Sequence, residues 1–183
     1  RSRVFDRFGN CGYKYGMSEL PIVLLAEDDP AIVRMIERLI NRTLGNAEKN
    51  PKFKYLEFSN GSEAIVAIQR DTRKLIIAVI SDNTLTDGFK GLQVIDAAVQ
   101  AGIPYITSLS SYGSDGLIET CNDTNIASRS VAKNERTTIV IGFEGEPSKD
   151  KREVTCNLKP VTAENVIAIA QEIKSHLEAY YFK

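Results

Sequence analysis

Residues 75–82, with the sequence LIIAVISD, decide the fold class because an unbroken apolar run ends in an acidic residue. Leu, Ile and Val without polar alternation are typical of a strand covered on both faces, as in a parallel sheet between helices. Ser81 and Asp82 then close the run with polar groups. We therefore expect a central parallel strand that carries a carboxylate at its carboxyl end.

The segments around this strand alternate between strand and helix patterns. Apolar residues recur every three or four positions in helices predicted from Pro30, from Ser62 and through 92–102. Strands are predicted at 22–26, 53–58 and 103–109, a hairpin at 137–143 with 153–158, and a last helix at 162–181. Strands that alternate with helices imply right-handed crossovers and one parallel sheet covered on both sides.

The composition limits the classes of protein to which this chain could belong. A chain of 183 residues can form one well-cored domain, and 23 basic against 24 acidic residues give no charge excess for binding nucleic acid. Three cysteines without paired spacing and a single histidine argue against a disulfide framework or a zinc site. The sequence has no membrane-length apolar run and no signal-peptide core, so we expect a soluble cytoplasmic protein without a membrane partner.

The first residues differ from the rest of the chain. Residues 1–16 are basic and rich in glycine, and they have no periodicity. They are interpreted either as a leader that is not native to the protein or as an N-terminal arm that packs on the domain. The domain itself is placed at 17–183.

Polar side chains follow the predicted strands at their carboxyl ends, where open parallel sheets bind ligands. Three carboxylates at one edge repel one another unless a cation lies among them, and hard oxygen ligands favour Mg²⁺, with Mn²⁺ as a second choice. A lysine and a hydroxyl there could bind phosphoryl oxygens, and a carboxylate beside the metal could act as nucleophile. The residues at these strand ends are Glu27, Asp28, Asp82, Ser110 and Lys159.

Four segments together resemble the signatures of the receiver domains of response regulators. They are LLAEDDP at 24–30, ISDNTLTDG at 80–88, LSS at 109–111 and LKP at 158–160. The resemblance covers about 20–112 and 153–181. It implies an α/β, flavodoxin-like, doubly wound parallel sheet with strand order 2-1-3-4-5.

The resemblance also implies a role for each site residue. Asp82 would be the phosphoacceptor, with Lys159 and Ser110 as its catalytic partners. Asp29 is interpreted as a helix cap rather than a ligand. The metal ligands would be Glu27, Asp28, Asp82 and the backbone carbonyl of Thr84.

The implied function is a switch rather than an enzyme that acts on a metabolite. A sensor histidine kinase or a histidine phosphotransfer protein would supply the phosphoryl group from phosphohistidine, and the domain would signal to a downstream protein by contact. Direct nucleic-acid binding is not expected.

The stretch between Ser110 and Lys159 is about twice as long as the family needs, which implies an insertion at about 113–151. We expect its 137–143 strand to add an antiparallel edge strand, and the changed surface to give a different partner or a homodimer.

Departures from the family pattern keep an alternative open. Thr86 stands where the family carries a proline, and Cys156 stands where an aromatic residue is frequent. A pseudo-receiver that acts as a phosphorylation-independent interaction module is therefore the main competitor. A phosphatase of the haloacid-dehalogenase type would need an acid in place of Thr84, and a flavin-binding protein would need a hydroxyl-rich loop after the first strand.

Overall fold

The computed structural model of the protein describes residues 19–86, 91–109 and 162–181 in full. For Ser110 and for the strands at 4–5, 11–12, 126–133, 136–143 and 152–158 it describes the backbone alone. Lys159 and, within the predicted insertion, residues 113–125, 134–135 and 144–151 lie outside the described residues.

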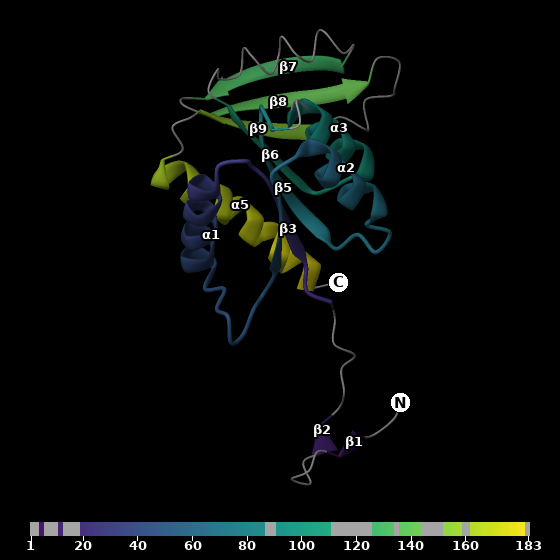
Figure 1. The fold of residues 1–183 in the computed structure, drawn as a ribbon, viewed down its shortest axis with the longest axis vertical. Helices are drawn as coiled ribbons and strands as arrows, with labels where there is room; N and C mark the ends of the chain where they lie inside the picture. Colours follow the sequence, from purple (N-terminus) through teal and green to yellow (C-terminus); the bar gives the residue numbers. More distant parts are fainter. Residues whose placement is uncertain are drawn as a thin grey trace.

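A seven-stranded sheet forms the centre of the molecule, in the order β4-β3-β5-β6-β9-β8-β7 (Figure 1). Five of its strands run parallel in the predicted order 2-1-3-4-5. These five are β3 (Ile22–Ala26), β4 (Lys54–Phe58), β5 (Ile76–Asp82), β6 (Tyr105–Ser110) and β9 (Arg152–Leu158). The predicted flavodoxin-like fold is therefore confirmed.

Two antiparallel strands extend this sheet beyond β9. Strand β8 (Arg136–Phe143) pairs antiparallel with β9, as predicted for the insertion. Strand β7 (Ile126–Lys133) pairs antiparallel with β8 along its whole length and was not predicted. Its sequence IASRSVAK contains small and polar residues with only two large aliphatic ones, which gives a weak strand pattern.

A separate two-stranded sheet lies within residues 1–16, where the sequence shows no periodic pattern and no strand was predicted. Strand β1 (Val4–Phe5) pairs antiparallel with β2 (Cys11–Gly12).

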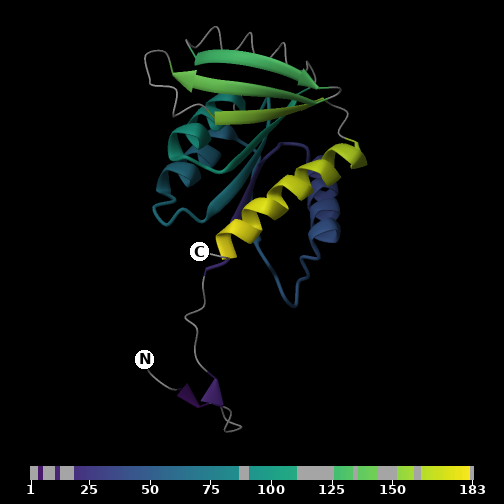
Figure 2. The ribbon, with the colours of Figure 1, turned by 180° about the vertical axis from the view of Figure 1, so that it is seen from behind.

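Helices cover both faces of the parallel strands, as Figures 1 and 2 show from opposite sides. Helices α1 (Pro30–Leu44) and α5 (Ala163–Tyr181) pack on one face, and α2 (Gly61–Arg70) and α3 (Gly91–Ala101) pack on the other. Strand β5 is buried along its whole length, which explains its unbroken apolar run. None of the described helices is both long and apolar enough to cross a membrane.

Polar caps fix where the helices begin. The Ala31 N–H donates to Asp29 Oδ1 over 2.7 Å at the start of α1, so the predicted capping role of Asp29 is confirmed. Asn60 caps α2 in the same way, and the Asn165 N–H donates to Thr162 Oγ1 over 3.2 Å at the start of α5. The strand predicted from residue 103 begins later, because the N–H groups of Gly102 and Ile103 close the end of α3.

Two isoleucines of α5 offer a matched test of this packing. Ile169 is fully buried in the core between α1, α5 and the sheet, whereas Ile167 is 38% exposed. Ile169→Ala should lower the free energy of unfolding by about 2–5 kcal/mol, since it removes a buried side chain and leaves a cavity. Ile167→Ala should change it by about 0.5 kcal/mol at most. Urea denaturation measures both values, and equal losses would contradict the arrangement of α5.

Candidate functional site

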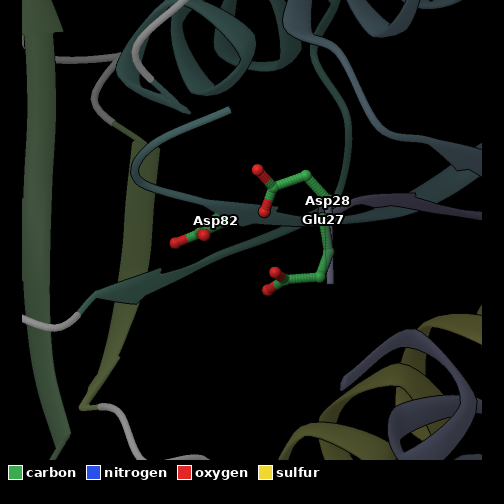
Figure 3. A group of neighbouring side chains, drawn as sticks. All are labelled: Glu27, Asp28 and Asp82. Carbon is green, nitrogen blue, oxygen red and sulfur yellow. The ribbon is translucent and has the colours of Figure 1, made fainter. Parts of the chain in front are cut away.

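Three carboxylates converge at the carboxyl edge of the sheet because β3 and β5 are adjacent parallel strands. Ala26 at the end of β3 pairs with Ser81, so Glu27 and Asp28 emerge beside Asp82. One carboxylate oxygen from each of the three lies within 4.8 Å of those of the other two. Figure 3 shows the three side chains extending from the ends of the strands toward one common space.

Burial and backbone contacts hold these groups in place. Glu27 is only 4% exposed and Asp82 only 8%, while Asp28 is half-buried. The Asn83 N–H donates to Asp82 Oδ1 over 2.6 Å, and the Asp29 N–H donates to Glu27 Oε1 over 3.2 Å. Asp29 itself is exposed and caps α1, so it belongs to the helix rather than to the carboxylate cluster.

The donor set fits a small divalent cation. Two oxygens bound to one Mg²⁺ lie at most about 4.2 Å apart, because each Mg–O distance is about 2.1 Å. The separations in the cluster are at most 4.8 Å, so a small shift of the side chains or a bridging water would complete the coordination.

The loop after Asp82 is tied to its neighbours by hydrogen bonds. The Asn83 N–H also donates to the carbonyl of Leu109 on β6 over 3.0 Å. Thr86 Oγ1 donates to the carbonyl of Ser59 over 2.8 Å and so connects this loop to the turn before α2. Thr86, which replaces the proline of the family pattern, therefore holds the loop through its hydroxyl group. Thr84 lies between these two anchors and is exposed.

Gly91 is a residue of this site that the sequence reasoning did not identify. It begins α3, and its N–H donates to the carbonyl of Asn83 over 2.8 Å. A Cβ atom at this position would lie 1.7 Å from the carbonyl oxygen of Asp82 and 2.9 Å from the Cα of Asn83. Only glycine allows α3 to approach the Asp82 backbone this closely. Its sequence context, a glycine in a glycine-containing loop, does not indicate such a contact.

Of the other predicted site residues, Ser110 lies on the neighbouring strand β6, and Lys159 follows strand β9 in the sequence. Leu109 on β6 pairs with Asp82. Ser110 is the next residue and ends β6, so the backbone of Ser110 reaches the same edge of the sheet as Asp82. Leu158 pairs with Ser110 at the end of β9. Lys159, the next residue, lies outside the described residues, and the side chain of Ser110 is likewise not described.

Gly91→Ala tests the close approach of α3 to Asp82. The added methyl group overlaps a backbone carbonyl that cannot move without displacing the end of β5, so we expect a loss of more than about 2 kcal/mol in the free energy of unfolding. The exposed Gln93 lies on the same helix, and Gln93→Ala should change stability by less than about 0.5 kcal/mol. A well-folded Gly91→Ala protein of unchanged stability would contradict the contact.

No protein-family model and no curated protein matches the sequence. Solved structures do match the fold. The CheY-like response regulator receiver domain from Methanospirillum hungatei JF-1 superposes with a TM-score of 0.53 at 13% identity, over 88% of this chain and 99% of that one. The phosphorylated cyanobacterial phytochrome response regulator RcpA gives a TM-score of 0.52 at 14% identity, over 88% of this chain and 96% of that one.

These two superpositions support the fold that the strand order shows. The fold of this chain is that of a response-regulator receiver domain.

Proposed function

We propose that this protein is a response-regulator switch that accepts a phosphoryl group on Asp82 in a Mg²⁺-dependent reaction. The observation that carries the proposal is the convergence of Glu27, Asp28 and Asp82 within 4.8 Å at the carboxyl edge of a receiver fold. A helix cap or a loop cap needs one carboxylate, whereas three together are costly unless a cation is bound.

Phosphoryl transfer requires a nucleophile that is fixed in position. A carboxylate oxygen of Asp82 attacks phosphorus in line with the P–N bond of a phosphohistidine donor. The O–P bond forms as the P–N bond breaks, and the bonding electron pair returns to the imidazole nitrogen of the donor. The Asn83 N–H, which donates to Asp82 Oδ1, and the buried surroundings of Asp82 restrict the rotation of the carboxylate during this step.

The remaining residues would offset negative charge. A bound Mg²⁺ would neutralise charge on the incoming phosphoryl group, and Mn²⁺ could replace it. Glu27, Asp28, Asp82 and the Thr84 carbonyl would hold the cation, according to the family resemblance. Lys159 and Ser110 would contact the phosphoryl oxygens on the same basis.

The output is proposed to be a change in protein contacts. Ser110 lies in β6, which pairs with β9, and β9 in turn pairs with the antiparallel β8 and β7. A movement of the Ser110 hydroxyl toward a phosphoryl group would change the contacts of β6 with β9, and β9 carries the extension formed by β8 and β7. We propose a sensor histidine kinase or a histidine phosphotransfer protein as donor in the cytoplasm, and the β7–β8 extension as the surface for a downstream protein or a second copy.

Intact mass spectrometry after incubation with Mg²⁺ and acetyl phosphate tests the proposal. The wild-type protein should gain one phosphoryl group, and Asp82→Asn should gain none because the amide is not a nucleophile. Chelation of the metal should abolish the adduct as well.

A pair of neighbouring acids provides the matched control for the metal. Asp28→Asn removes a proposed ligand and should slow phosphorylation at a fixed Mg²⁺ concentration by at least about tenfold, which corresponds to about 1.4 kcal/mol. Asp29→Asn removes the same charge one residue later but keeps a good helix cap, so its rate should stay near that of the wild type.

Equal effects of the two substitutions would argue for general electrostatics rather than ligation. A wild-type protein that gains no phosphoryl group and binds no beryllofluoride would favour the pseudo-receiver.

A further inference from the structure

A pocket of about 340 Å³ lies at the amino ends of the strands, the edge opposite the carboxylate cluster. Its size falls within the range of small-molecule sites, which begins at about 300 Å³. It lies between the start of β5, the turn before β6 and the last turns of α5, whose C-terminal end is marked in Figure 2. Buried isoleucines form its floor: Ile68, Ile76, Ile77 and Ile103.

Lys74, at the rim of this pocket, has a strained backbone. Its φ of 54° lies in the left-handed region, and it is the one non-glycine residue with positive φ in the part of the chain that the structure describes. Its N–H donates to the carbonyl of Asp71 over 3.2 Å, which fixes the turn. Strained residues cluster at active sites and ligand clamps, so the strain at Lys74 marks this pocket as a candidate site.

Lys74 and Asp71 bring one positive and one negative charge to the lining of the pocket. Asp71 accepts hydrogen bonds from the N–H groups of Leu75 and Ile76 over 3.0 and 2.7 Å, so its two oxygens are directed to the backbone. Partial burial lowers the pKa of His176 below its ordinary value of 6.5, which favours the neutral form of this ring. The Lys74 ammonium makes no ion pair within the described residues.

Two aromatic rings line the same pocket. His176 lies against Tyr105, with ring centroids 6.0 Å apart and planes inclined by 30°. Tyr180 lines the pocket as well, while its hydroxyl donates to the carbonyl of Glu19 over 3.0 Å. An aromatic ring of a bound ligand can therefore pack against the rings of His176 and Tyr180 on one side and against isoleucine side chains on the other.

The helices α2, α3 and α5 all end at this edge, and their C-terminal dipoles favour cations. This effect acts within the last turn and is weakened by solvent, whereas an ammonium group in direct contact with an anion forms a charge-assisted hydrogen bond. We propose that this pocket binds a small aromatic carboxylate, with the carboxylate on Lys74 and the ring beside His176 and Tyr180.

NMR titration of the full chain with 1-naphthoate tests this site. We expect saturable shift changes at residues that line the pocket, such as Ile76, Ile103 and His176. Lys74→Gln should weaken binding about tenfold, which corresponds to about 1.4 kcal/mol. Lys49→Gln, which removes an exposed lysine that does not line the pocket, should leave the affinity unchanged. Ala101→Leu should weaken binding by occupying part of the space.

Lys74→Gly separates binding from folding. Glycine adopts the left-handed conformation without strain, so this variant should lose the same affinity as Lys74→Gln while its thermal unfolding midpoint stays equal or rises. The proposal is overturned if 1-naphthoate causes no saturable shifts, if Lys74→Gln binds as tightly as the wild type, or if the cation 1-naphthylmethylamine binds more tightly than the carboxylate.

Discussion

The repulsion among three carboxylates at one edge of the sheet is the constraint on which the rest of the site depends. Their oxygens lie within 4.8 Å of one another. Unit charges at this separation repel by roughly 1–3 kcal/mol per pair, for effective dielectric constants between those of water and a protein surface. Glu27 and Asp82 are also almost fully buried, which adds the cost of desolvation. The fold therefore sustains an arrangement that is unfavourable in the absence of a cation.

The surrounding backbone keeps the carboxylates together in spite of this repulsion. Parallel pairing of β3 with β5 sets the positions of Glu27 and Asp82. Gly91 allows α3 to pack against the carbonyl of Asp82, and Asn83 links the end of β5 to β6 through the Leu109 carbonyl. Each contact involves the main chain, which cannot relax by a change of rotamer. The geometry is in this way fixed before any ligand binds.

Much of this organisation could be predicted from the sequence, because it follows from local patterns. The apolar run before Asp82 indicated a doubly covered strand, and the acidic triplet before Pro30 indicated both the cluster and the cap at Asp29. The close approach at Gly91 could not be predicted, since it depends on how α3 meets β5 in three dimensions. Strand β7 was not predicted because most of its residues are small or polar. The pocket at Lys74 could not be predicted from the sequence either, because a left-handed φ is unusual for lysine.

The most direct measurement is thermal unfolding of the wild type and of Asp82→Asn, each with and without Mg²⁺. Asparagine retains an oxygen that accepts from the Asn83 N–H but removes one charge from the cluster. Asp82→Asn removes two of the three pairwise repulsions, so without metal the variant should be more stable than the wild type by roughly 2–6 kcal/mol. Mg²⁺ should raise the unfolding midpoint of the wild type and have little effect on the variant. A less stable variant, or equal shifts of both proteins by Mg²⁺, would contradict a cation site built from Glu27, Asp28 and Asp82.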